Sequence, residues 1–222
     1  FLEQLVTMTL PPVQVIATDH GWTARAQGTW WQAIWWETPA LAAITSGYQH
    51  QRLRRSGISA EQAHRYGLAR LDAKIELLRE HPEIRFAEFG ARRRFGLAWQ
   101  DRVVGRLKDR IPDQLAGTSN MLLAWKYGLP MIGTMAHQLF MGVAALWVRD
   151  GEPEAIGRSQ QRVLEQWEAM YGDYRNSELL IFLTDTYSTQ IALDYLPPAM
   201  ARRWAGMRQD SGDPIAYGEE LL

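Results

Sequence analysis

The chain has 222 residues, of which 46% are hydrophobic, and its formal net charge is −1. This length allows one large α/β domain, or one domain with part of another, and a sizeable core. The balanced charge excludes a global attraction to nucleic acid or to anionic membranes, and the absence of cysteine excludes disulfides and thiolate metal sites. No apolar run reaches the roughly 20 residues of a membrane span. The composition therefore favours a protein of the reducing cytoplasm with no membrane or nucleic-acid partner.

Both ends of the sequence look cut. It begins at Phe1 without an initiator Met and enters an apolar pattern at once, and it stops at Leu222 inside a predicted helix. We therefore expect an internal piece of a longer protein that lacks N- and C-terminal parts.

The first predicted elements are a hairpin and a helix. Residues 10–18 alternate apolar and polar side chains, as a half-buried strand does. Residues 19–21 favour a turn, after which residues 22–27 could return as a second strand. Residues 29–49 have helical spacing, and we expect Pro39 to kink this helix or divide it in two.

A second helix is predicted from its start. Ser59 is followed three residues later by Gln62, which is the pattern of a capping box. The helix is expected to continue to about Arg79 and to end at His81-Pro82. Because the rhythm of the sequence changes at this dipeptide, we place a domain boundary there.

Short strands alternate with helices in the remainder of the chain. The predicted strands are residues 85–89, 115–118, 131–134, 179–183 and 204–207. The predicted helices are residues 97–108, 120–127, 138–148, 154–171 and 191–195. This alternation indicates parallel βα units, as in a barrel or a doubly wound sheet.

Polar, chemistry-bearing residues follow each of these five strands. The segments are FGARRR at 89–94, GTSN at 117–120, GTMAH at 133–137, TDT at 184–186 and RQDSGDP at 208–214. In a parallel sheet the strand ends lie at one edge, which is where α/β proteins place their active sites. Five such ends in succession are a stronger signal than chance turns, so we predict one ligand site from them.

The first segment is basic and aromatic. Arginine binds carboxylates and phosphates through two parallel hydrogen bonds. An isolated run such as Arg92, Arg93 and Arg94 would be a solvated turn, but beside a strand end and Phe89 at least one of the three is expected to bind an anion. Phe89 could stack on a flat ring or fill the core.

The third segment carries His137. A lone histidine is more often structural than catalytic, but Asp185 ends a neighbouring predicted strand and could accept a hydrogen bond from the ring. A carboxylate in that place fixes the tautomer and stabilises the imidazolium, so His137 is a candidate base or nucleophile. Surface or turn positions are expected for the other histidines, His20, His50, His64 and His81.

The last segment is an acidic turn. Asp210 and Asp213 stand on either side of Gly212, and such turns hold sugar hydroxyls or Mg²⁺. Asp213 could equally be the N-cap of a helix that starts near Pro214. Arg208 indicates an anionic ligand, and the whole set suits a phosphorylated sugar together with a small aromatic acid. No group of His, Asp and Glu shows metal-ligand spacing, and no P-loop or GxGxxG is present.

Together these segments resemble the nicotinate phosphoribosyltransferase family. The matching pieces, in the order of the family, are GTWWQAIWWETPALAAI, EFGARRRF, LAGTSNMLLAWKYG, IGTMAH, LTDTYST and RQDSGDP, from about Val13 to the last residue. The resemblance implies the irregular α/β barrel of type II phosphoribosyltransferases beside an α+β domain. Residues 1–82 would be part of the α+β domain with a helical connection, and residues 83–222 part of an incomplete barrel.

The family's reaction is the joining of nicotinate to phosphoribosyl pyrophosphate, which gives nicotinate mononucleotide and pyrophosphate in NAD salvage. The resemblance implies coupling to ATP hydrolysis through a phosphohistidine, with ATP and Mg²⁺ required, and a homodimer with active sites at its interface.

The resemblance also assigns the substrate side. Phe89 would stack on the pyridine ring, and Arg92 would help to hold the nicotinate carboxylate or a nearby phosphate. Thr118 and Ser119 would line the substrate site. Ser119 stands where the related nicotinamide enzyme has an acid, and a neutral residue there suits an anionic substrate.

The phosphate side follows in the same way. His137 would be the histidine phosphorylated by ATP, and Asp185 its hydrogen-bonded partner. Arg208 and Asp210 would bind phosphoribosyl pyrophosphate, with Asp210 at the ribose hydroxyls.

The sequence departs from the family pattern next to the histidine. Gln138 stands where the family has Glu, which could tune the basicity of the ring, so we expect altered ATP coupling. Ala91 and Gly96 are further departures. The family's N-terminal residues that reach the partner's site and its Gly-rich phosphate loop are not in this chain, so we expect the 222 residues alone to be inactive.

Two alternatives remain open at this point. One is a nicotinamide or other pyridine phosphoribosyltransferase, against which Ser119 argues. The other is a truncated or divergent homologue without catalytic activity, which Gln138, Ala91 and the missing ends support. The joint presence of five candidate site residues argues against this second alternative, namely Arg92, His137, Asp185, Arg208 and Asp210.

Overall fold

The computed structural model describes the chain except for residues 1–6, 150, 152–153, 173–178 and 222. The chain consists of two compact units, Phe1–Ile132 and Gly133–Leu222. The predicted boundary at His81-Pro82 falls within the first unit, and the assignment of residues 1–82 and 83–222 to two domains of the family stays a prediction.

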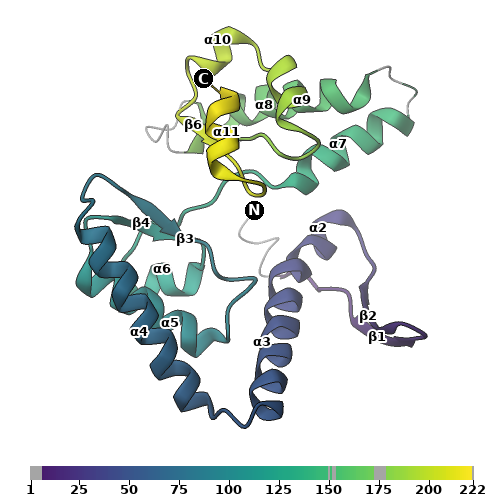
Figure 1. Cartoon of the computed structure of the whole chain (residues 1–222). Helices are drawn as coiled ribbons and strands as arrows, with labels where there is room; N and C mark the ends of the chain where they lie inside the picture. Colours follow the sequence, from purple (N-terminus) through teal and green to yellow (C-terminus); the bar gives the residue numbers. More distant parts are fainter. Residues whose placement is uncertain (1–6, 150, 152–153, 173–178, 222) are drawn as a thin grey trace. The chain divides into compact units, whose positions relative to one another are not determined.

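An exposed hairpin begins the described chain (Figure 1). Strands β1 (Val13–Thr18) and β2 (Gly21–Ala26) pair antiparallel as predicted, from Val13 opposite Ala26 to Thr18 opposite Gly21. Nearly all of its side chains face solvent, and Val15 and Trp22 are 67% and 77% exposed.

The helical segment after the hairpin is divided, but not at Pro39. A short helix α2 (Trp30–Ala33) leads through a 3₁₀ turn (Ile34–Trp36) into α3 (Glu37–Arg55). Pro39 lies in the first turn of α3, where the missing N–H has no intrahelical partner to lose. The predicted division is therefore present, and the proline belongs to the start of the second helix.

Helix α4 (Ala60–Arg79) starts with the predicted cap. The Ser59 hydroxyl accepts from the Gln62 amide at 3.1 Å, and the Gln62 side chain accepts from the Ser59 amide at 2.8 Å. This reciprocal pair satisfies two amide donors that the first turn would otherwise leave unbonded.

A two-stranded parallel sheet carries the chemistry-bearing segments of the first unit. Strands β3 (Phe86–Glu88) and β4 (Leu115–Thr118) are joined through α5 (Leu97–Arg110), and α6 (Met121–Tyr127) follows β4. The two helices pack against β4 (Figure 1). Buried apolar residues between α4, α5 and β4 form the core, namely Ile75, Leu107, Ile111 and Leu115.

The strand predicted over residues 131–134 is wrong. Only Met131 pairs, in a single parallel bridge with Thr118. Its neighbours bond the same residue, because the Thr118 amide donates to Pro130 O at 3.2 Å and the Ile132 amide donates to Thr118 O at 3.0 Å. After Thr118 the segment that follows β4 turns away into α6. Residues 133 and 134 therefore have no neighbouring strand with which to pair.

Gly117 permits this close approach. A Cβ at this position would lie 2.3 Å from the backbone oxygen of Pro130, far inside van der Waals contact. Only a glycine therefore lets the 130–132 segment come within hydrogen-bonding distance of β4.

The second unit is built on a second parallel pair. Strands β5 (Ile181–Leu183) and β6 (Gly206–Arg208) pair from Ile181 opposite Gly206 to Leu183 opposite Arg208. Its helices are α7 (His137–Arg149), α8 (Ala155–Tyr171), α9 (Thr189–Asp194), α10 (Pro198–Ala201) and α11 (Pro214–Leu221). Helices α7 and α8 pack side by side (Figure 1).

The core of this unit is large and apolar. Its buried members are Met135, Phe140, Val163, Leu164, Phe182, Leu183, Ala192 and Met200. They come from β5, from helices α7 to α10 and from the segment before α7, so the loop after β5 starts from a closely packed base.

The fold class is mixed α/β, as predicted. The strands of the described residues form three two-stranded sheets, one antiparallel and two parallel. Closure into a barrel stays a prediction. Within the described ranges, no helix is both long enough and apolar enough to span a membrane.

Candidate active site

His137 is the first residue of α7 and stands among polar groups of the second unit. Its Nδ1 lies 3.2 Å from the Thr186 hydroxyl, and its Nε2 lies 3.4 Å from Oδ2 of Asp210. Asp185, the acceptor expected from the sequence, has Oδ1 4.0 Å from Nε2, which is beyond hydrogen-bond distance. The nearest carboxylate to the ring is therefore that of Asp210.

The parallel pair explains why these groups meet. Strand β5 ends at Leu183, so Asp185 and Thr186 follow it, while Asp210 follows the end of β6. Because parallel neighbours end at the same edge, both loops are brought to one side of the pair. Three residues predicted for the phosphate side, His137, Asp185 and Asp210, therefore lie together.

A carboxylate cannot donate when ionised, so the ring must donate to Asp210. In the neutral tautomer this places the proton on Nε2, and Nδ1 then accepts from the Thr186 hydroxyl. Thr186 was not singled out from the sequence, although it lies in the quoted TDT segment. The hydrogen bond between its hydroxyl and the ring of His137 can be recognised only in the folded structure.

Asp185 is held as an anion. Burial alone would raise its pKa, but a hydrogen bond from Ser211, one from the backbone amide of Asp210 and attraction to His137 together hold the pKa of Asp185 below its ordinary value. The Ser211 hydroxyl donates to Oδ2 at 2.6 Å. The other oxygen, Oδ1, is buried and has no hydrogen-bond partner among the described residues, which is an uncommon state for a buried polar atom.

Arg208 is fixed in the same place. Its Nη1 donates to Oδ1 of Asp210 at 3.2 Å, and its Nη2 donates to the backbone oxygen of Met135 at 3.3 Å. The Nε of Arg208 is buried and has no hydrogen-bond partner in the part of the chain that the structure describes. Asp185 and Arg208, which carry opposite charges, thus each keep one buried atom that no described residue bonds.

Asp213 has a structural role at the start of α11. Its Oδ1 accepts from the amides of Ile215 and Ala216 at 2.8 and 3.0 Å. This is the N-cap arrangement, one of the two roles that the sequence leaves open for Asp213.

The residues that the sequence predicts for the substrate side lie in the first unit, at the ends of β3 and β4. Phe89 is 47% exposed, which leaves its ring free for stacking. Arg92 donates to the Glu37 carboxylate of α3 at 2.5 Å, an exposed ion pair. Exposed pairs of this kind contribute about 0–1 kcal/mol. Anion binding by Arg92 stays a prediction.

Thr118 and Ser119 differ in what they offer. Thr118 is fully buried, and its hydroxyl donates to the Glu88 carboxylate at 2.7 Å. The Ser119 amide donates to Glu88 O at 2.9 Å, while its hydroxyl has no partner within the described part of the chain. Ser119 can therefore offer a hydroxyl to a ligand, and Thr118 as a substrate contact stays a prediction.

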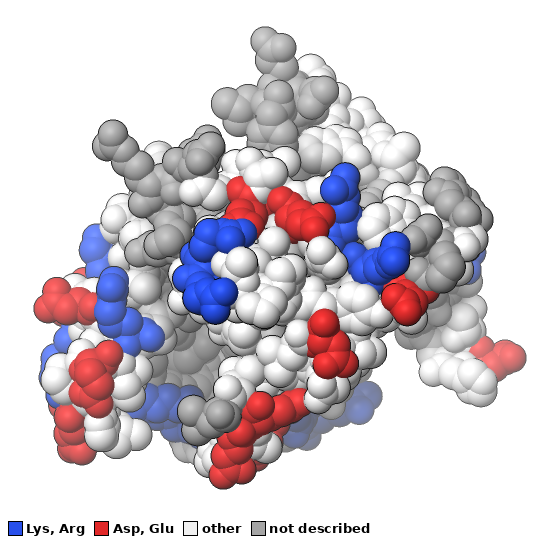
Figure 2. All heavy atoms as spheres, turned by 90° about the horizontal axis from the view of Figure 1, so that it is seen from above, with Lys and Arg blue, Asp and Glu red and all other residues white. Residues whose placement is uncertain are grey.

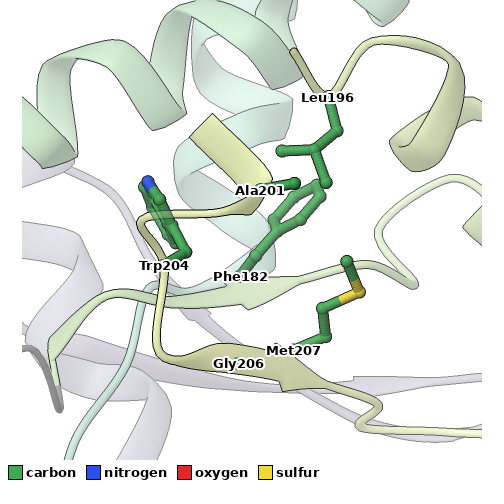
Figure 3. A pocket seen from close by; sticks show the side chains of 6 residues that line it. All are labelled: Phe182, Leu196, Ala201, Trp204, Gly206 and Met207. Carbon is green, nitrogen blue, oxygen red and sulfur yellow. The ribbon is translucent and has the colours of Figure 1, made fainter. Parts of the chain in front are cut away.

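Figure 3 shows a small apolar hollow beside β6, lined by Phe182, Leu196, Ala201, Trp204, Gly206 and Met207. Its volume is about 50 Å³. Small-molecule pockets usually occupy about 300 to 1,000 Å³, so this hollow is imperfect packing. On the face in Figure 2, basic side chains lie among acidic ones, and the described residues form no continuous basic area there.

The sequence pattern of the nicotinate phosphoribosyltransferase (NAPRTase) family matches residues 84–222. The chain belongs to this family. The matched range holds every segment from the arginine run to the acidic turn, so the resemblance drawn from those motifs is confirmed.

Two solved structures of nicotinate phosphoribosyltransferases show the same fold. The one from Porphyromonas gingivalis is 33% identical with a TM-score of 0.77, and the match covers 94% of this chain and 49% of that one. The one from Vibrio cholerae is 30% identical with a TM-score of 0.79, with 100% and 50% covered. The chain thus spans about half the length of these NAPRTase structures.

Proposed function

We propose that the protein to which this chain belongs transfers the phosphoribosyl group of phosphoribosyl pyrophosphate to nicotinate, and that His137 is phosphorylated by ATP. The observation that carries the proposal is the group around His137, where Thr186 and Asp210 hold the ring and Asp185 lies 4.0 Å away. A histidine oriented through its ring nitrogens by a hydroxyl and a carboxylate is arranged for phosphoryl transfer.

A ring nitrogen of His137 attacks the γ-phosphorus of ATP, the bond to the bridging oxygen breaks, and ADP leaves. The ring keeps its other proton, and Asp210 stabilises the resulting cation. Phosphorylated His137 then favours tight binding of the sugar phosphate, which is how ATP hydrolysis is coupled to product formation.

In the transfer itself the pyridine nitrogen forms a bond to C1 of the ribose as pyrophosphate departs. The sugar passes through an oxocarbenium-like state, and charge develops on the leaving group. Arg208 is suited to this charge because no described residue bonds its buried Nε. On the substrate side, Phe89 stacks on the pyridine, Arg92 binds the carboxylate and Ser119 offers its hydroxyl.

Mg²⁺ is compatible with these residues, although no group of three or more His, Cys, Asp or Glu side chains that could hold a metal occurs among the described residues. Magnesium is usually held by one or two carboxylates together with substrate phosphates. Asp185 fits such a role because its Oδ1 is buried without a partner, and Asp210 is the second carboxylate. When bound, the ion would neutralise developing charge on the pyrophosphate.

The test uses the complete gene product and ATP labelled at the γ-phosphate. We expect acid-labile, base-stable label on the protein, and its loss together with the loss of ATP stimulation in His137→Ala. The exposed histidine variant His20→Ala serves as the matched control and should keep both. Label retained in His137→Ala would assign it elsewhere, and no label in the folded wild type would favour a homologue without catalytic activity.

The choice of pyridine is tested separately. In a competition assay at binding equilibrium, nicotinate should bind more tightly than nicotinamide. Arg92 supplies a positive charge for the carboxylate, and the uncharged Ser119 does not repel it. Preference for the amide would point to a nicotinamide phosphoribosyltransferase. We also propose that the complete protein is a homodimer in the cytoplasm. Analytical ultracentrifugation of the complete protein tests the oligomeric state.

A further inference from the structure

The carboxylate of Glu88, at the end of β3, is bonded to three different segments of the first unit. It accepts from the Gly90 amide at 2.6 Å, from the Thr118 hydroxyl at 2.7 Å, and from Nε2 of Gln100 at 2.9 Å. These donors come from the loop after β3, from the end of β4 and from α5. One side chain therefore joins both strand ends to the helix between them.

Gln100 extends these contacts. It is only 2% exposed, and its Oε1 accepts from Nη1 of Arg94 at 3.0 Å and from Nδ2 of Asn120 at 2.9 Å. Asn120 in turn caps α6 by accepting from two amides of its first turn. We call Glu88, Arg94, Gln100, Thr118 and Asn120 the Glu88 network.

The orientation of the network is fixed by its chemistry. Glu88 only accepts, so the amide nitrogen of Gln100 must face it, and the amide oxygen must face Arg94 and Asn120. A flipped amide would set donors against donors. In a buried place such a fully satisfied set is rigid, and the loss of one member leaves others unpaired.

We propose that Glu88 is a positioning residue for the nicotinate-binding residues of the first unit, a role that rests on the proposed function. Its carboxylate fixes the loop that carries Phe89 and Arg92 relative to the segment that carries Ser119. Glu88 does not itself bind substrate, because its oxygens are occupied by protein donors. Its charge is thereby also satisfied within the protein instead of opposing an anionic ligand.

The principal variant is Glu88→Gln, which keeps the size of the side chain but presents an NH₂ group to other donors. In the complete gene product we expect KM for nicotinate to rise about 10- to 100-fold, because misplacement of binding groups by about an ångström has effects of this size. The KM for phosphoribosyl pyrophosphate and the labelling of His137 should stay close to wild type. Glu80→Gln, an exposed glutamate on the same unit, is the matched control and should change nothing.

Two further variants keep the proposal falsifiable if Glu88→Gln fails to fold. Glu88→Asp retains the charge and should restore much of the nicotinate KM, and Thr118→Val removes one hydrogen bond to Glu88 and should raise KM less than Glu88→Gln does. An unchanged KM in Glu88→Gln, or an equal loss of kcat and His137 labelling, would overturn the positioning role.

Loop order is measured independently of activity. Hydrogen exchange at the amides of Gly90 and Asn120 should accelerate in Glu88→Gln and not in Glu80→Gln. If the wild type had no activity with nicotinate, the proposed function would fail, while the exchange result would still decide whether Glu88 orders the loops.

Discussion

Asp185 shows how single contacts set the charge of the site. Its pKa lies below the ordinary value in the folded chain, in spite of burial, because Ser211, the Asp210 amide and His137 favour the anion. The stabilisation is therefore fully present above the unfolded pKa of about 3.9 and is lost as the pH falls through the lower folded pKa.

Removal of the Ser211 hydroxyl tests this balance. In Ser211→Ala we expect the pKa of Asp185 to rise toward its ordinary value, and unfolding to become easier by about 1 kcal/mol at neutral pH. The difference in free energy of unfolding between variant and wild type should shrink as the pH falls below about 4, because the Asp185 carboxylate then becomes protonated in both proteins. Carboxyl NMR titration measures the pKa, and Ser56→Ala, an exposed serine of the first unit, is the control. An unaltered Asp185 titration would contradict the assignment.

At the scale of elements, Gly117 fixes how the 130–132 segment meets β4. Gly117→Ala should destabilise the chain by about 1 to 3 kcal/mol, because the new methyl meets a backbone oxygen at 2.3 Å that cannot rotate away. Thermal unfolding measures the loss, and faster exchange of the Ile132 amide should accompany it. Gly133→Ala, where a Cβ meets nothing within 4 Å, should be nearly neutral; equal stability of the two variants would refute the explanation.

The elements that the sequence predicts correctly are determined by residues close together in the chain. Ser59 and Gln62 define the start of α4, and the spacing of apolar residues defines its face, so neither depends on distant parts of the chain. The strand over 131–134 failed because its length depends on where a partner ends, which only the turn into α6 decides. Local pattern cannot contain that information.

In the candidate site, too, some features follow from the local sequence and others only from the folded structure. The motifs around His137, Asp185 and Asp210 were visible because rare residue types follow strands. The distances from His137 Nε2 to the two carboxylates could not be predicted. Side-chain packing in the folded unit decides that Asp210, and not Asp185, lies nearer to this nitrogen. Glu88 was missed altogether, because a glutamate at a strand end looks like any solvated carboxylate until its donors are known.

At the scale of the whole molecule, each of the two units has its own buried cluster and its own parallel pair. Parallel pairing explains why the segments after β3 and β4 come together in the first unit, and those after β5 and β6 in the second. The meeting of all five predicted strand ends at one edge stays a prediction.

The exposed hairpin has a consequence for solubility. Strand β1, with the sequence VQVIAT, is uncharged, rich in β-branched residues and paired on one side only in its two-stranded sheet. An open edge of this composition is a template for intermolecular β-pairing, and a net charge of −1 supplies little repulsion between molecules. Val15→Lys should therefore slow aggregation in a light-scattering assay, whereas Gln51→Lys, with the same charge on α3, should not. Equal rates for the two variants would place the self-association elsewhere on the chain.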